Sequence, residues 1–219
     1  VNANCFLILY LPPMDTLFTT IAGWLGSQTL LETIGVITGT LCVYLAAKNK
    51  IWNWPVAIIS VAIYIVIFFE AKLYADMGLQ FYFMATNLYG WYFWSRKSAV
   101  GAEVKVRSIN QKEILFSLLA IAIFTPLLGF TLLYQTDASF PFIDSFCTAC
   151  SLVAQFFLAR KIVQNWLIWI FVDLIYVVIY LMKGLDLTAV MYMLYIYIAT
   201  VGYLDWRKMY QKQQQADAA

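Results

Sequence analysis

Histidine is absent from the 219-residue sequence. Its absence excludes a histidine-containing catalytic triad, a histidine metal site and a histidine proton relay. Charged residues are also scarce: they make up 12% of the chain against 63% hydrophobic residues, whereas a soluble domain has about 25% charged residues. A water-facing surface cannot be built from this composition. The net charge of +2 is small and the basic residues are dispersed, which argues against nucleic acid as a partner.

Cysteine is rare as well. Cys147 and Cys150 form a C-x-x-C spacing, but inside an apolar stretch rather than after a strand. We interpret them as small, polarizable core residues, with redox or metal chemistry as the alternative. The sequence contains neither a nucleophile beside an activating base nor a metal-binding cluster, so we expect no enzymatic activity, metal or cofactor.

Seven apolar segments are present, each compatible with the roughly 17–25 residues that cross a bilayer as a helix. They comprise residues 31–47, 53–69, 78–94, 112–134, 144–159, 165–182 and 187–206. Aromatic residues reach 18% of the chain, more than two interfacial belts need, so we expect some to line a path or a site. The sequence therefore predicts an all-α membrane protein with seven transmembrane helices.

The N-terminal 30 residues lie outside these spans. Residues 14–30 carry Phe18, Ile21, Trp24 and Leu25 at helical spacing, which predicts an interfacial amphipathic helix. Residues 1–13 have no basic start and no small-residue cleavage site before Pro12 and Pro13, so we do not expect a signal peptide there. An extension upstream of a start at Met14 is the alternative.

Basic residues indicate how the spans are oriented. The predicted topology puts 12 of the 14 lysines and arginines on one side: Lys48, Lys50, Arg96, Lys97, Lys105, Arg107, Lys112, Arg160, Lys161, Arg207, Lys208 and Lys212. Only Lys72 and Lys183 fall on the other. By the positive-inside rule the basic side is cytoplasmic. We therefore expect the N-terminus outside and the C-terminus inside.

The two halves of the chain match when the sequence is shifted by 112 residues. The shift pairs Lys48 with Arg160, Asn53–Trp54 with Asn165–Trp166, Gly90 with Gly202 and Trp94 with Trp206. Each copy, at 31–97 and 144–208, contains three spans, and the span at 112–134 turns the second copy parallel to the first. A short tail, 209–219, follows. Such 3+1+3 parallel repeats occur in secondary transporters, whose substrate site lies at the repeat interface near mid-membrane.

Several polar residues fall inside the spans, where an ionised carboxylate costs roughly 2.5–3.5 kcal/mol. Asp173 lies midway along its span and shares a helix face with Trp169 and Tyr176. A carboxylate among aromatic rings suits a flat cation, although a structural Asp bonded to a neighbour is the alternative. The shift pairs Asp173 with Val61, so this polar group is not duplicated with the scaffold.

Amide side chains extend the candidate site. Gln80, Asn87 and Trp91 share a stripe on the third span with Met84, and Gln155 lies in the fifth span. Interhelical hydrogen bonding is the alternative for all of them, and we favour it for Thr148 and Ser151. The predicted substrate-binding set comprises Gln80, Asn87, Trp91, Gln155, Trp169, Asp173, Tyr176 and Tyr195.

Four tryptophans lie at helix ends. Trp54 and Trp166 start helices and Trp94 and Trp206 end them, a placement typical of an interfacial belt. Gly90 and Gly202 precede the last two by four residues and are expected to allow close helix approach.

Two runs identify a family resemblance. Trp52-Asn53-Trp54-Pro55 and the stretch 79–94, LQFYFMATNLYGWYFW, resemble the PnuC-type nicotinamide riboside transporters. The resemblance implies a fold similar to the SWEET sugar transporters, the bacterial inner membrane, a homotrimer, and facilitated diffusion with the vitamin trapped by cytoplasmic phosphorylation. Sister branches carry thiamine or riboflavin, which are alternative substrates. The proline–glutamine pair of many SWEET-like repeats is missing here. A seven-span sensor is a further alternative, although its cytoplasmic segments would be short.

Overall fold

The computed structural model describes residues 30–70, 74–96, 104–136 and 139–218. These residues form seven helices: α2 (Leu30–Ala47), α3 (Asn53–Glu70), α4 (Tyr74–Ser95), α5 (Gln111–Gln135), α6 (Pro141–Ala159), α7 (Asn165–Met182) and α8 (Asp186–Ala218). The predicted amphipathic helix at 14–30 lies outside the described residues, apart from Leu30, which begins α2.

All seven predicted spans correspond to helices. Five of the helices are long and apolar enough to cross a membrane: α3, α5, α6, α7 and α8. Within the described residues, α2 counts as a shorter apolar helix, and α4 carries Gln80, Thr86 and Asn87 among its aromatic residues. The all-α, multi-pass membrane architecture is confirmed. The last helix is longer than expected, because α8 continues from Trp206 as far as Ala218.

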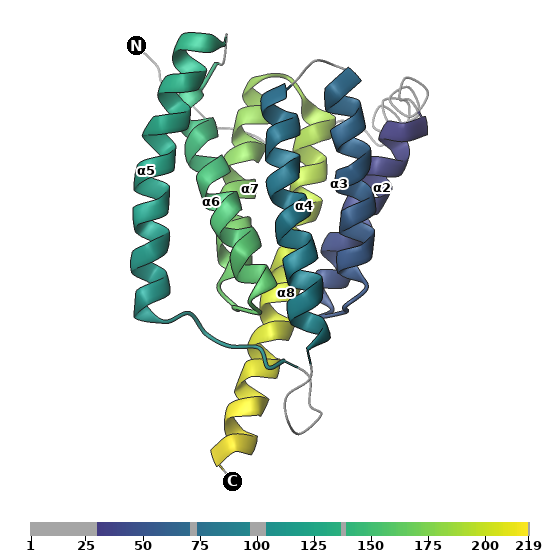
Figure 1. The fold of residues 1–219 in the computed structure, drawn as a ribbon, viewed down its shortest axis with the longest axis vertical. Helices are drawn as coiled ribbons and strands as arrows, with labels where there is room; N and C mark the ends of the chain where they lie inside the picture. The colour runs from purple at the N-terminus through teal and green to yellow at the C-terminus, as the bar shows by residue number, and fades with distance from the viewer. Residues whose placement is uncertain (1–29, 71–73, 97–103, 137–138, 219) are drawn as a thin grey trace, which may run out of the picture.

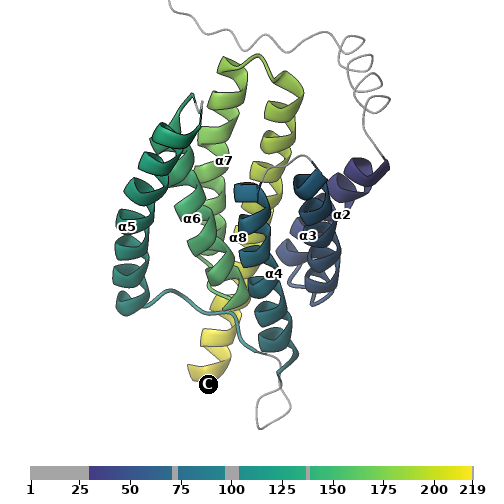
Figure 2. The ribbon, with the colours of Figure 1, turned by 45° about the horizontal axis from the view of Figure 1, so that its top comes forward.

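Six helices form a closed ring in which α2 contacts α3, α3 contacts α4, α4 contacts α6, α6 contacts α7, α7 contacts α8, and α8 returns to α2. Helix α5 packs on α6 outside this ring and lies at the edge of the bundle in both ribbon views (Figures 1 and 2). The α2–α3 and α6–α7 turns lie at the same end as the start of α5 and the projecting end of α8 (Figure 1). We call this end, which contains Lys48, Lys50, Arg160 and Lys161, the basic end.

Turns that the 112-residue shift relates have the same geometry. Asn49 and Lys161 lie in the turns two residues after α2 and α6 and have positive φ angles of 52° and 54°. The following helices then begin alike: Asn53 Nδ2 donates to the Lys50 carbonyl at 2.7 Å, and Asn165 Nδ2 donates to the Ile162 carbonyl at 2.6 Å. These equivalences agree with two parallel three-helix repeats, and the closer likeness to SWEET transporters stays a prediction.

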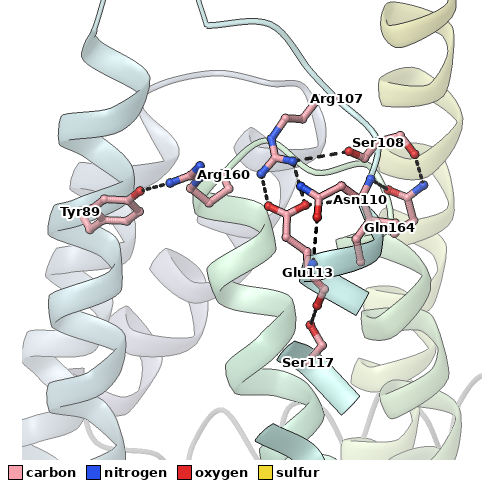
Figure 3. Close-up of polar contacts among 9 residues, drawn as sticks. Tyr89, Arg107, Ser108, Asn110, Glu113, Ser117, Arg160 and Gln164 are labelled. Carbon is pink, nitrogen blue, oxygen red and sulfur yellow. Dashed lines mark hydrogen bonds and ion pairs between the residues drawn. The ribbon is translucent and has the colours of Figure 1, made fainter. Parts of the chain in front are cut away.

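The segment before α5 is fastened to the α6–α7 turn (Figure 3). Arg107 N donates to the Lys161 carbonyl and Val163 N donates to the Arg107 carbonyl, at 2.9 and 3.0 Å. The Arg107 guanidinium donates one hydrogen bond to each carboxylate oxygen of Glu113. Glu113 in turn completes a capping box with Asn110 at the start of α5. The linker helix is therefore held to the second repeat at the basic end.

Candidate functional site

A cavity of about 310 Å³ lies inside the six-helix ring. Every helix except α5 contributes to its wall. Its polar and aromatic lining residues are Asn53, Trp54, Tyr64, Asn87, Gln155, Trp166, Trp169, Asp173, Tyr192 and Tyr195. Three of these begin α3 and α7 at the basic end, whereas Asp173 lies eight residues into α7, about 12 Å deeper along the helix. The cavity therefore extends from the basic end towards the middle of the bundle.

Asp173 is buried in this cavity, with 6% of its surface exposed. Within the described residues no basic side chain forms an ion pair with its carboxylate. Its neighbours in the wall are aromatic: Trp169 one turn earlier on α7, and Tyr192 and Tyr195 on α8. An isolated buried carboxylate is unfavourable until an opposite charge or hydrogen-bond donors reach it. The site is suited to a ligand that carries a positive charge on a flat ring.

Asn87 and Gln155 meet across the boundary between the two predicted repeats. Gln155 Nε2 donates to Asn87 Oδ1 at 2.8 Å, and both side chains are buried. The shift pairs these residues with Ala199 and Val43, which line the same cavity from α8 and α2. The two amides therefore have no polar counterpart at the equivalent positions of the opposite wall, where Val43 and Ala199 lie beside the rings of Tyr192 and Tyr195. This asymmetry suits a ligand whose two edges differ in polarity.

Tryptophans close the cavity at the basic end. Trp54 and Trp166 line it, and Trp94 and Trp206 pack behind them, with Trp54–Trp94 and Trp166–Trp206 centroids 5.2 and 5.6 Å apart in edge-to-face contacts. Trp94 Nε1 donates to the Ala159 carbonyl and Trp206 Nε1 donates to the Ala46 carbonyl. All four indoles are at most 5% exposed. The interfacial-belt interpretation is wrong, because these rings form the core of the bundle.

The glycines predicted to allow close helix approach lie against these rings. A Cβ at Gly202 would lie 2.9 Å from Trp166 Cε2, and a Cβ at Gly90 would lie even closer to the Trp54 ring. Each glycine thus faces an indole rather than the backbone of another helix. The glycines therefore make room for an indole of a neighbouring helix, and the close approach of helix backbones stays a prediction.

Five of the eight predicted site residues line the cavity: Asn87, Gln155, Trp169, Asp173 and Tyr195.

The other three are placed elsewhere. Trp91 is 41% exposed, because the buried stripe of α4 passes through Asn87, Gly90 and Trp94 instead. Gln80 lies two turns from Asn87, beyond the reach of the cavity, and Tyr176 lines a second cavity. The predicted stripe through Gln80, Met84, Asn87 and Trp91 is therefore wrong at its end, because the buried face continues from Asn87 to Gly90 and not to Trp91.

Residues that sequence reasoning did not assign to the site also line it. Trp54 and Trp166 were expected at the membrane surface, and Asn53, Tyr64 and Tyr192 were not assigned to the site. The indole nitrogens of Trp54 and Trp166 are buried without a hydrogen-bond partner among the described residues. The duplicated Asn-Trp pair, matched by the duplicated glycines, was the signal for a shared interior role. The interhelical hydrogen bond favoured for Ser151 is wrong, because its hydroxyl donates to the Cys147 carbonyl of its own helix.

Comparison with known proteins gives consistent matches. Residues 29–208 match the family described as nicotinamide mononucleotide transporter. The nicotinamide riboside transporter PnuC of Escherichia coli (strain K12) is 34% identical over 203 residues, 80% of this chain and 84% of the relative. The riboflavin/roseoflavin transporter RibM of Streptomyces davaonensis is 28% identical, covering 84% of this chain and 91% of the relative.

A solved structure has the same fold. The crystal structure of the vitamin B3 transporter PnuC matches with a TM-score of 0.68 at 22% identity, covering 91% of this chain and 89% of the other.

Proposed function

This chain belongs to the nicotinamide mononucleotide transporter family, and from that membership we propose that it carries nicotinamide riboside across the membrane by facilitated diffusion. Relatives named as nicotinamide riboside transporters support this substrate. The observation that carries the proposal is a buried carboxylate, Asp173, without an ion-pair partner among the described residues, in a cavity walled by aromatic rings.

The chemistry of the substrate matches the cavity group by group. Nicotinamide riboside joins a cationic pyridinium ring, a carboxamide and a ribose. Asp173 neutralises the cation, and Trp169 offers a ring face for stacking. Asn87 and Gln155 supply a donor and an acceptor each for the carboxamide or the ribose hydroxyls. A cavity of about 310 Å³ is within the range of small-molecule sites.

Charge separates this substrate from riboflavin, the substrate in the name of a relative. The isoalloxazine ring is neutral, so it would leave the Asp173 carboxylate without a counter-charge in a buried site. Thiamine is cationic and flat, and it is the stronger competitor on charge alone. Discrimination between thiamine and nicotinamide riboside falls to Asn87 and Gln155, which match a carboxamide and hydroxyl groups.

We expect the driving force to come from the substrate gradient and from the membrane potential. An inside-negative potential favours entry of a monovalent cation by about 2.3 kcal/mol per 100 mV. Phosphorylation of the imported nicotinamide riboside in the cytoplasm would then trap it there by adding negative charge. This scheme places the basic end in the cytoplasm of a bacterial cell, the N-terminus outside and the chain in the inner membrane. The family resemblance further implies that three copies of this chain assemble as a homotrimer.

The test is calorimetric titration of the purified protein with nicotinamide riboside, thiamine and riboflavin. Asp173→Asn should weaken nicotinamide riboside binding about tenfold or more, since a charge-assisted contact is lost. Gln80→Ala is the matched control, because Gln80 lies outside the cavity. Equal affinity in the native protein and in Asp173→Asn would refute the site. Binding of thiamine alone would reassign the substrate, and binding without uptake into vesicles would favour a sensor.

A further inference from the structure

A second cavity, of about 510 Å³, lies between the linker helix and the second predicted repeat. Two of its tyrosines, Tyr176 and Tyr180, contact Tyr192 of the central cavity, with ring centroids 5.3 and 5.1 Å apart. Helix α5 contributes Phe124, Leu128 and Leu132, and α4 contributes Leu79. Helices α6 and α7 with its C-cap contribute the remaining lining: Asp144, Ser145, Thr148, Leu152, Tyr176, Ile179, Tyr180 and Lys183. Phe124 is 44% exposed, so the cavity borders the surface of the bundle. None of its residues lines the central cavity.

The polarity of this second cavity changes along the helix axis. Leu132, Leu128 and Phe124 form an i, i+4, i+8 stripe on α5, which spans about 12 Å. Along α6, Asp144 comes first, Thr148 one turn deeper and Leu152 two turns deeper. The charged residues therefore sit at the end opposite the basic end, and the deeper part is mostly apolar, lined by Phe124, Leu152 and the ring of Tyr176. A headgroup above an acyl chain has the same order.

Two opposite charges stand at the polar end of this cavity. Asp144 is half-buried and Lys183 is exposed. Within the described residues neither forms an ion pair, although both line the same space. Opposite charges that line one space without a direct ion pair are suited to a ligand that is itself a zwitterion. An acidic ligand would meet the Asp144 carboxylate, and a purely cationic one would meet the Lys183 ammonium.

We propose that the cavity between α5, α6 and α7 binds a zwitterionic phospholipid with a primary ammonium headgroup. Lys183 contacts the lipid phosphate and Asp144 accepts hydrogen bonds from the ammonium, while an acyl chain lies along Leu132, Leu128 and Phe124. Charge-assisted hydrogen bonds of this kind are the strong ones. The bound lipid then fills the space between the linker helix and the second repeat.

The experiment is native mass spectrometry of the purified full-length chain titrated with three phospholipids of matched acyl chains. Phosphatidylethanolamine should form a retained one-to-one adduct. Phosphatidylglycerol lacks the ammonium and phosphatidylcholine has no N–H to donate, so both should bind at least about tenfold more weakly, as loss of a charge-assisted hydrogen bond predicts. The double variant Asp144→Asn with Lys183→Gln should lose the preference for phosphatidylethanolamine.

A packing variant tests the same site without touching its charges. Leu128→Trp places a larger side chain inside the cavity and should abolish the adduct. Leu127→Trp is the matched control, since Leu127 immediately precedes Leu128 on α5 and is 61% exposed. The proposal is overturned if Leu128→Trp retains the adduct, if all three lipids bind equally, or if nicotinamide riboside displaces the lipid competitively.

Discussion

Gly90→Ala tests the tryptophan core directly. A Cβ at Gly90 would meet Trp54 Cζ2 and Cζ3 at 2.5 Å, well inside the normal contact distance. Trp54 cannot retreat easily, because it is fully buried and packs edge-to-face against Trp94. Overpacking of this kind costs about 1–3 kcal/mol. At about 2–4 °C per kcal/mol for a chain of this size, the melting temperature should fall by roughly 2–12 °C.

Gly78→Ala is the matched control in the same helix. Nothing lies within 4 Å of a Cβ built there, so the substitution should be neutral or slightly stabilising through helix propensity, by up to about 1 kcal/mol. The assay is thermal unfolding in one detergent, followed by calorimetric titration with the substrate. Gly90→Ala should also weaken binding, because the displaced Trp54 ring lines the cavity.

A double-mutant cycle identifies the cause. Trp54→Ala destabilises by itself, about 3–5 kcal/mol for a buried aromatic residue, but adding Gly90→Ala in that background should cost nothing further. The two changes are therefore strongly non-additive. The reasoning is refuted if Gly90→Ala melts no lower than Gly78→Ala, or if the penalty of Gly90→Ala is unchanged without the Trp54 ring.

Three further predictions concern the site and the linker. The losses of substrate affinity caused by Asn87→Ala and Gln155→Ala should be non-additive, because the two amides hydrogen-bond each other. We expect a coupling free energy of about 1 kcal/mol, measured by titration of the single and double variants. Additive losses would argue that the two side chains act separately. Asn110→Ala should lower the melting temperature by about 2–4 °C, since it removes the cap of α5 at a cost of about 1 kcal/mol, whereas Gln111→Ala should not. Cys42 lines the central cavity, so in a variant with serine at the other cysteines substrate should slow its maleimide labelling; labelling at an unchanged rate would contradict its placement.

Helix positions were largely predictable, since a bilayer requires continuous apolar segments with internally bonded backbones. The structure places helices over all seven predicted spans. The length of α8 was not predicted, because hydropathy falls after Trp206 while helix formation does not depend on hydropathy. Its polar continuation, which is rich in Gln and Lys, is still a good helix former.

Side-chain direction was the weaker part of the sequence prediction. Asn87 and Trp91 are four residues apart, and periodicity alone grouped them on one face. The structure buries Asn87 and Gly90 and exposes Trp91, because the large Trp54 ring fits only against a residue without a Cβ. A tryptophan at a helix end looks the same in sequence whether it meets lipid or a neighbouring helix. Only its partners distinguish the two.

The amino-acid sequence by itself determined the membrane character, the helix positions and the 112-residue correspondence, because these depend on local composition and spacing along one chain. The tertiary structure decided which polar groups share a cavity, since Asn87, Gln155 and Asp173 come from three helices whose relative rotation is set by packing. It also placed Tyr176 in a different cavity and packed the Trp54 ring against Gly90. Contacts between helices depend on how side chains from different helices pack, and that packing exists only in the assembled six-helix ring.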